Sequence, residues 1–209
     1  MLKALIISNG DLKDIDILKY YNNVDVVICA DGGARHLYNR NLKPDIIIGD
    51  LDSLDGRILE SYKNLAVKFE KHPTRKNMTD TELSINYAIN IGAREIVLLG
   101  ATGNRLDHSI ANVLILYRLA YENVNMTIID SHNEIFVVKN ILKLRKKEGY
   151  FISIIPLVDS KVTLKGFEYN TNSLEFKLGS TLGISNRIID EEGLIQVDSG
   201  ICLVIRSRE

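Results

Sequence analysis

The first two thirds of the chain alternate between short apolar runs and longer amphipathic segments, and this alternation constrains the fold most strongly. The apolar runs are candidate strands at residues 5–7, 24–29, 46–48, 66–69, 96–99 and 126–129. The segments between them are candidate helices at residues 14–21, 34–39, 56–62, 79–91 and 106–121. Strands that are apolar at nearly every position are typical of parallel sheets covered on both faces. The pattern therefore predicts an N-terminal parallel-sheet α/β/α domain over residues 1–132.

After residue 131 the pattern changes to short β-rich runs without a clear helical period. These runs lie at residues 135–138, 150–155, 162–164, 174–178, 194–197 and 201–205. The glycines that punctuate them are Gly149, Gly166, Gly179, Gly193 and Gly200. Short strands separated by turn residues favour an antiparallel arrangement. We therefore expect residues 133–209 to form a C-terminal all-β sandwich domain.

The charge balance limits the classes of partner. The chain carries 26 Lys and Arg against 27 Asp and Glu, a formal net charge of −1. This gives no general attraction to nucleic acid or to an anionic membrane, so any phosphate binding must be local. Cys29 and Cys202 lie in apolar runs and are expected to be buried thiols. No apolar run approaches the roughly 18 residues of a membrane span, and no signal peptide is evident, so we expect a cytoplasmic protein.

Polar clusters follow four of the predicted strands. They are Asn9-Gly10-Asp11, Asp31-Gly32-Gly33, Gly49-Asp50-Leu51-Asp52-Ser53, and the segment from Gly100 to His108. In an open parallel sheet, ligands bind beyond the carboxyl ends of the strands. We expect these clusters to share one edge of the sheet.

Asp50 and Asp52 are the acids most suited to a metal. In extended backbone, residues two apart point to the same side. Two like charges about 4 Å apart repel by about 4 kcal/mol at an effective dielectric constant of about 20, and a bound cation removes that cost. Oxygen ligands without His or Cys favour Mg²⁺, which normally also takes substrate phosphates. The alternative interpretation is a solvated turn in which Asp52 or Ser53 caps the next helix.

The other clusters also have two interpretations each. The Asp31-Gly32-Gly33 turn either lets a phosphate or ribose approach the backbone or is a tight turn capped by Asp31. The segment Thr79-Asp80-Thr81-Glu82 fits a capping box, and Asp80 would otherwise be a third metal ligand or a base. Arg105 suits a phosphate, whereas a histidine such as His108 at a helix start is more often structural. The P-loop and G-x-G-x-x-G signatures are absent from the sequence.

Taken in order, these motifs resemble those of the thiamine pyrophosphokinase family. The matching pieces are residues 31–34, Pro44-Asp45 leading into 49–53, residues 79–82, residues 100–108 and Ser185-Asn186. The resemblance implies an α/β N-terminal domain, a β-sandwich C-terminal domain that binds thiamine, and a homodimer. It implies a magnesium-dependent enzyme that transfers a pyrophosphoryl group from ATP to the hydroxyl of thiamine, giving thiamine diphosphate and AMP.

The resemblance also implies roles for individual residues. Mg²⁺ would be held by Asp50, Asp52 and Asp80, and these three with Arg105 would be the catalytic residues. ATP would be bound by Asp31, Gly32, Gly33, Ser53, Thr79, Thr102, Arg105, Asp107 and His108. Thiamine would be contacted by Lys76, Asn77, Ser185 and Asn186, the last two across the dimer interface.

The chain departs from the family pattern at Asn77, where bacterial relatives commonly carry Asp, and at Asn104, where they often carry Gly. It has no Trp, which some relatives place against thiamine, so a Tyr, Phe or aliphatic residue would have to serve. Three alternatives stay open. They are a pyrophosphokinase for another alcohol such as a pterin, a non-catalytic nucleotide or thiamine sensor, and a metal-dependent glycosyltransferase.

Overall fold

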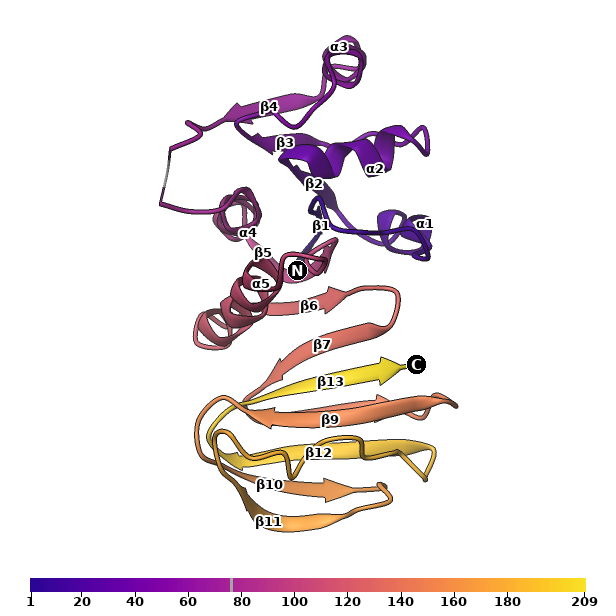
Figure 1. The fold of residues 1–209 in the computed structure, drawn as a ribbon, viewed down its shortest axis with the longest axis vertical. Helices are drawn as coiled ribbons and strands as arrows, with labels where there is room; N and C mark the ends of the chain where they lie inside the picture. The colour runs from indigo at the N-terminus through magenta and orange to yellow at the C-terminus, as the bar shows by residue number, and fades with distance from the viewer. Residues whose placement is uncertain (76) are drawn as a thin grey trace. The chain divides into compact units, whose positions relative to one another are not determined.

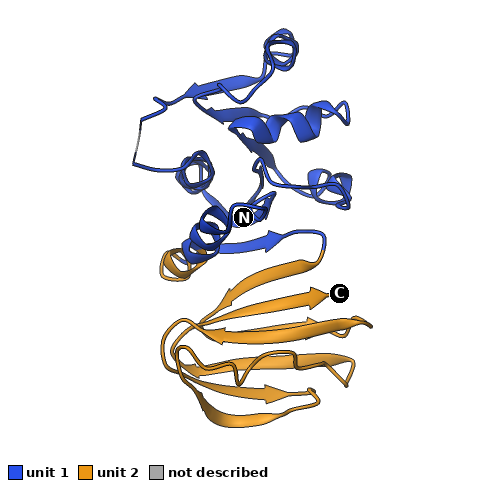
Figure 2. Ribbon diagram, viewed as in Figure 1, with its two compact units in different colours: residues 1–115, 123–131 blue, residues 116–122, 132–209 orange. Residues whose placement is uncertain are grey.

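The computed structural model describes residues 1–75 and 77–209 and divides the chain into two compact units. Unit 1 comprises Met1–Ile115 and Asn123–Ser131, and unit 2 comprises Leu116–Glu122 and His132–Glu209 (Figure 2). The order of the elements along the chain can be followed in Figure 1. Among the described residues, no helix is both long enough and apolar enough to cross a membrane.

Six strands of unit 1 pair side by side, and every pairing between them is parallel. In spatial order they are β4 (Lys68–Lys71), β3 (Ile46–Gly49), β2 (Val26–Ala30), β1 (Leu2–Ile7), β5 (Ala93–Leu99) and β6 (Asn125–Ile129). Ile7, the last residue of β1, lies opposite both Cys29 and Leu99. The predicted parallel sheet is confirmed, and the carboxyl ends of its strands meet at one edge.

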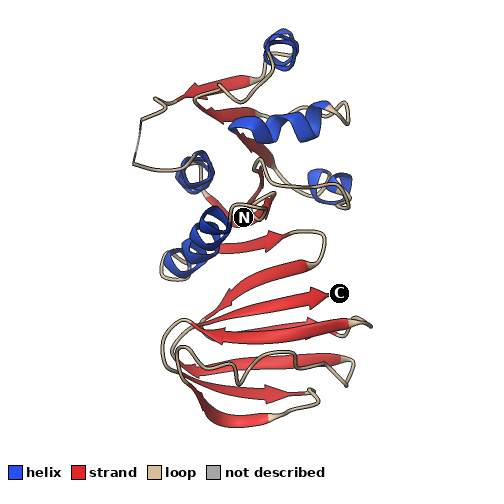
Figure 3. Cartoon of the chain, in the orientation of Figure 1, coloured by secondary structure: helices blue, strands red, loops and turns tan. Residues whose placement is uncertain are grey.

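Helices lie on both sides of this sheet (Figure 3). On one side are α1 (Ile17–Tyr21), α2 (Ala34–Tyr38) and α3 (Gly56–Asn64), whose residues Ile17, Leu37 and Tyr62 join one buried cluster with alternate residues of the strands. On the other side are α4 (Asp80–Asn90) and α5 (Leu106–Leu119). A single 3₁₀ turn, Asp31–Gly33, joins β2 directly to α2. Burial on both faces is the reason why the strands are apolar at nearly every position.

Unit 2 contains two antiparallel groups of strands. One is β7 (Asn133–Val138), β13 (Cys202–Arg208) and β9 (Tyr150–Pro156). The other is β11 (Thr171–Phe176), β10 (Ser160–Lys165), β12 (Glu192–Ser199) and β8 (Ile141–Arg145). Ile154 and Val204 from the first group share a buried core with Val162 and Ile195 from the second. Two sheets around one core form the predicted β-rich sandwich.

The structure corrects several element boundaries. The strand β8 was missed, and the strand expected at residues 174–178 is β11, which ends at Phe176. A turn follows, in which Gly179 has a φ angle of 85° and the Ser180 N–H donates to the Lys177 carbonyl at 2.9 Å. The helix expected from residue 14 begins at Ile17, after the N-cap Asp16. The capping interaction before α4 is confirmed, since the Glu82 N–H donates to Thr79 Oγ1 at 3.2 Å.

A largely buried ion network joins β7 to β13 in unit 2. The Glu134 carboxylate accepts from Lys147 Nζ at 2.6 Å and from the Arg206 guanidinium, whose side chain is only 10% exposed. Arg206 also donates to the Arg145 carbonyl. Burial disfavours the charged carboxylate, but the hydrogen bonds from Lys147 and Arg206 outweigh it and lower the pKa of Glu134. Removing this carboxylate would leave Arg206 as a buried, uncompensated charge.

We predict that Glu134→Gln lowers the free energy of unfolding by about 3–5 kcal/mol at pH 7, the usual cost of breaking a buried ion pair. Because the folded-state pKa is lowered, the gap to the wild type is full above the unfolded value of about 4.3 and closes as pH falls through the folded value. Urea unfolding followed by circular dichroism at several pH values measures it. The matched control is Glu148→Gln, since Glu148 pairs with Lys146 at the surface. Equal effects of the two substitutions would contradict a stabilising network.

Candidate active site

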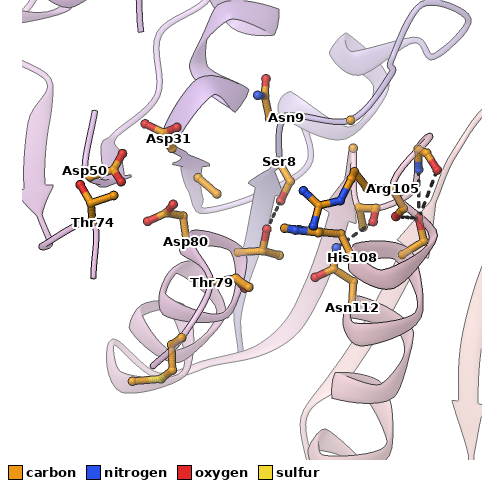
Figure 4. Close-up of a pocket in the computed structure, with 18 residues that line it drawn as sticks. Ser8, Asn9, Asp31, Asp50, Thr74, Thr79, Asp80, Arg105, His108 and Asn112 are labelled. Carbon is orange, nitrogen blue, oxygen red and sulfur yellow. Dashed lines mark hydrogen bonds between the residues drawn. The ribbon is translucent and has the colours of Figure 1, made fainter. Parts of the chain in front are cut away.

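A cleft of about 460 Å³ opens at the carboxyl edge of the sheet in unit 1 (Figure 4). It is lined by the ends of β1, β2, β3 and β5, by the start of α4 and by the first turns of α5. Asp31, Asp50 and Asp80 lie toward one end, and Arg105 and His108 toward the other. The polar clusters that follow the predicted strands therefore do meet at one edge, as the topology requires.

Three carboxylates cluster at the acidic end, and of these Asp31 and Asp50 line the cleft while Asp52 lies next to it. One oxygen each from Asp31, Asp50 and Asp52 lies within 4.8 Å of the others. Parallel pairing places Ala30 opposite Ile48, so the loops after β2 and β3 emerge side by side. The Leu51 N–H donates to Asp31 Oδ1 at 3.1 Å, and the Asp52 N–H donates to Asp50 Oδ1 at 3.3 Å. Hydrogen bonding with Asp50, then desolvation, then the charges of Asp50 and Asp31 raise the pKa of Asp52.

The structure rejects the helix-capping interpretation of this loop. The following helix, α3, begins at Gly56 and is capped by Asp55, whose Oδ1 accepts from the Arg57 N–H at 2.8 Å. Asp52 and Ser53 precede that cap, and Ser53 Oγ donates to Asp52 at 3.3 Å. Asp31 and Leu51 have positive φ angles of 42° and 68°. A left-handed conformation costs a non-glycine residue about 1–2 kcal/mol, so this loop is held in shape against a local preference.

The cluster includes Asp31, which the sequence assigned to the nucleotide site. Asp80, the third metal ligand that the sequence suggested, lies beside the three carboxylates at the start of α4, and its role as a ligand stays a prediction. A Cβ placed on Gly49 would lie 2.8 Å from Asp31 Cβ and 3.1 Å from Asp80 Oδ1. Gly49 therefore allows both side chains to approach the end of β3, which a larger residue would prevent.

The other end of the cleft carries Arg105 and His108. Arg105 pairs with Asp107 through two hydrogen bonds, Nε to Oδ1 at 3.0 Å and Nη2 to Oδ2 at 2.6 Å. This pairing raises the pKa of Arg105 and holds that of Asp107 well below its usual range. Asp107 does not line the cleft itself. It contacts Arg105, which does. Thr102 is likewise turned to Asp130, to which its hydroxyl donates at 2.9 Å.

Several residues that the sequence assigned to the site do not line the cleft. Gly32 and Gly33 are buried, and a Cβ on Gly33 would lie 2.1 Å from the Ile7 carbonyl oxygen, so close backbone packing explains this glycine. Ser53 is exposed outside the cleft, as is Asn77, whereas Thr79 lines it. Lys76 lies outside the described residues.

Ser8 and Asn112 are among the cleft residues that sequence reasoning missed. Ser8 Oγ lies 2.9 Å from Thr81 Oγ1, linking the end of β1 to the first turn of α4. Asn112 is 6% exposed, and its Nδ2 donates to the Ala101 carbonyl at 2.7 Å. Asn112 follows His108 by four residues on the same face of a largely apolar helix, and this polar pair was the available signal.

The two predicted thiamine residues in unit 2 differ in their exposure and in their hydrogen bonds. Ser185 is exposed with a φ angle of 60°, and its N–H donates to Ser153 Oγ at 3.1 Å. Asn186 is 6% exposed. Its Oδ1 accepts from the Tyr169 N–H at 3.1 Å and its Nδ2 donates to the Tyr169 carbonyl at 2.8 Å. The Asn186 amide thus fixes the backbone of Tyr169, whose side chain is 66% exposed.

A parallel sheet with an open polar cleft at its carboxyl edge defines unit 1 as a ligand-binding α/β domain. The family model "Thiamin pyrophosphokinase, catalytic domain" matches residues 17–128, and "Thiamin pyrophosphokinase, vitamin B1 binding domain" matches residues 139–202. The thiamine pyrophosphokinase of Bacillus subtilis (strain 168) is 30% identical over 214 residues, covering 100% of each sequence.

Solved structures of similar proteins indicate the same family. A thiamine pyrophosphokinase from Bacillus subtilis superposes with a TM-score of 0.90 at 29% identity, covering 99% of each chain. A thiamin pyrophosphokinase from Geobacillus thermodenitrificans gives 0.87 at 29% identity, covering 100% of this chain and 98% of the other. The chain belongs to the thiamin pyrophosphokinase family.

We predict that Asp31→Asn weakens Mn²⁺ binding, measured by calorimetry with Mn²⁺ as the Mg²⁺ probe, by at least tenfold, or about 1.4 kcal/mol. The reason is that Asp31 supplies one of three clustered carboxylates, whereas Asp80 lies beside them. Asp80→Asn should have the smaller effect. Asp55→Asn is the matched control, because Asp55 caps α3 outside the cluster and Asn is also a good cap. Binding that is unchanged by Asp31→Asn would exclude it as a ligand.

Proposed function

We propose that this protein transfers a pyrophosphoryl group from ATP to the primary hydroxyl of thiamine, giving thiamine diphosphate and AMP. The observation that supports this most directly is the cleft, which joins a carboxylate cluster to Arg105 and His108 within the segment that matches the catalytic family model. The match of residues 139–202 to a vitamin B1 binding domain favours thiamine over a pterin as the acceptor.

The reaction is a displacement at the β-phosphorus of ATP. The thiamine hydroxyl oxygen forms a bond to that phosphorus, while the bond from the phosphorus to the oxygen bridging it to the α-phosphorus breaks. AMP leaves with the bridging oxygen, and the hydroxyl proton passes to a base or to water. Asp80 is the proposed group that orients or deprotonates the hydroxyl, because it lines the cleft beside the carboxylate cluster. Positioning and charge neutralisation supply most of the rate in such transfers.

The residues at the acidic end fit a hard divalent cation such as Mg²⁺. Asp31, Asp50 and Asp52 would hold it, with Asp80 next to them, and all of these offer only oxygen ligands. When bound, Mg²⁺ neutralises phosphate charge and orients the phosphate oxygens. Arg105 and His108 would bind the nucleotide at the other end, where the guanidinium offsets negative charge on the phosphates. Asp107 would act by holding Arg105 in place.

We propose Tyr169 as the aromatic residue that packs on thiamine. Its ring is exposed, and Asn186 fixes its backbone by hydrogen bonds to both the N–H and the carbonyl group. The thiazolium ring of thiamine is a cation, which an aromatic face attracts by about 0.5–2 kcal/mol. Asn186 would then be a positioning residue, and Ser185, which is exposed next to it, would contact thiamine directly.

The thiamine residues are proposed to act across a homodimer. Large apolar side chains are exposed near Ser185 in the sequence of unit 2, namely Leu178, Leu182, Ile184 and Ile189. Large apolar side chains left exposed along one segment favour a surface that another protein covers. A second copy of this chain is the proposed partner.

We predict that Asp52→Asn reduces the rate of AMP formation by roughly 10² or more, or about 2.7 kcal/mol, while the fold stays intact. The loss arises because the neutral side chain no longer balances a cation. The assay is incubation with ATP, Mg²⁺ and thiamine, with chromatography of AMP and thiamine diphosphate. Asp55→Asn is the matched control. Near-normal turnover of Asp52→Asn at saturating Mg²⁺ would exclude the metal role.

For the acceptor site, Tyr169→Ala should raise the KM for thiamine by roughly tenfold, or about 1.4 kcal/mol, through loss of the aromatic face. The KM for ATP should stay within twofold of the wild type. Tyr169→Phe keeps the ring and should behave like the wild type, which separates the ring from the hydroxyl group. Parallel changes in both KM values would argue against a contact with thiamine.

A further inference from the structure

A second cleft, of about 500 Å³, adjoins the acidic loop of unit 1. It shares Asp50 with the first cleft and is otherwise lined by different residues. Its charged lining residues are Asp50, Asp52, Lys63 and Lys71. Leu51, Leu59 and Phe69 supply its apolar lining. Asp52, Lys63 and Lys71 do not line the first cleft, although the Asp52 carboxylate clusters with those of Asp31 and Asp50 at its edge.

Both lysines are carried by well-anchored backbone. Lys71 ends β4, where it lies opposite Gly49, and the next N–H, that of His72, donates to the Gly49 carbonyl at 2.9 Å. Lys63 is in the last turn of α3 and follows Tyr62, which is 1% exposed. The Tyr62 hydroxyl lies 3.2 Å from the Ala34 carbonyl and 3.1 Å from the Leu42 carbonyl. The register of β4 and the burial of Tyr62 thus fix the backbone positions from which both lysines line this cleft.

The net charge of this cleft depends on whether a cation is bound. Its two carboxylates and two ammonium groups cancel, so the empty cleft has no net attraction for an anion. A divalent cation on the carboxylates would leave a net charge of +2 in the same space. Lys63 and Lys71 form no ion pair with any other described residue, so their charges are available to a ligand. A phosphate group that also contacts the cation is the ligand class that fits.

We propose that Lys63 and Lys71 bind the terminal phosphate of ATP in the second cleft. This inference rests on the proposed function, because it assigns a place to the third phosphate of that substrate. The α-phosphate would lie in the first cleft toward Arg105, the β-phosphate at the Asp50 loop, and the γ-phosphate between the lysines. The γ-phosphorus is then turned away from the first cleft, where Asp80 and the acceptor hydroxyl meet. The arrangement explains why the β-phosphorus is attacked, so that the oxygen bridging it to the α-phosphorus departs with AMP.

The test compares the affinities of ATP and AMP, because AMP lacks the phosphate in question. With Mg²⁺ present and thiamine absent, calorimetry should show that Lys71→Met and Lys63→Met each weaken ATP binding by roughly tenfold. The affinity for AMP should stay within twofold of the wild type. Lys68→Met is the matched control, since Lys68 is an exposed residue of the same strand that does not line the cleft.

Equal losses of ATP and AMP affinity in the lysine variants would overturn the proposal, because they would indicate a general disturbance of the nucleotide site. Unchanged ATP affinity, or an equal loss in Lys68→Met, would also overturn it. The comparison of ATP and AMP affinities does not depend on catalytic turnover. If the wild type binds ATP and forms no thiamine diphosphate, the proposed function fails while the affinities of the lysine variants still decide the place of the third phosphate.

Discussion

The close approach of backbones at the carboxyl ends of β1, β2 and β5 is the constraint on which the active-site cleft depends. A Cβ on Gly10 would lie 2.3 Å from the Thr102 carbonyl oxygen, and one on Gly100 would lie 2.4 Å from the Ser8 carbonyl oxygen. Real Cβ atoms do not approach so closely, so only glycine allows these loops to meet. The Gly10 N–H donates to the Gly100 carbonyl at 2.9 Å and closes the contact. The loops after these strands therefore pack against one another and form a continuous base for the cleft.

At the base of the cleft, the fold brings like charges close together, which costs free energy. Asp31, Asp50 and Asp52 come from two neighbouring strand ends, and Asp31 and Leu51 adopt left-handed conformations to bring them together. The hydrogen bond from the Leu51 N–H to Asp31 holds the two loops in register. Repulsion and backbone strain both oppose this arrangement, and a bound cation with its phosphate ligands offsets the repulsion. The acidic end is therefore better suited to binding than to stability.

In unit 2, contacts of Ser185 and Asn186 with thiamine stay a prediction. The structure shows that the Asn186 amide bonds the backbone of Tyr169, 17 residues away in sequence. Nothing in the local pattern indicates which partner a buried amide takes, because that choice depends on the strand pairing around it. The residue that the amide presents, Tyr169, had no motif of its own.

The sequence by itself determined the parallel sheet of unit 1, the β-rich character of unit 2 and the family. It could do so because apolar strand composition, helix capping at Thr79 and ordered polar clusters are local signals. Tertiary structure alone decided that Asp31 joins Asp50 and Asp52, that Asn112 faces the cleft, and that Lys63 and Lys71 share a cleft with the acidic loop. These are distances between segments far apart in the chain. They follow from strand register and backbone packing, for which a local pattern carries no information.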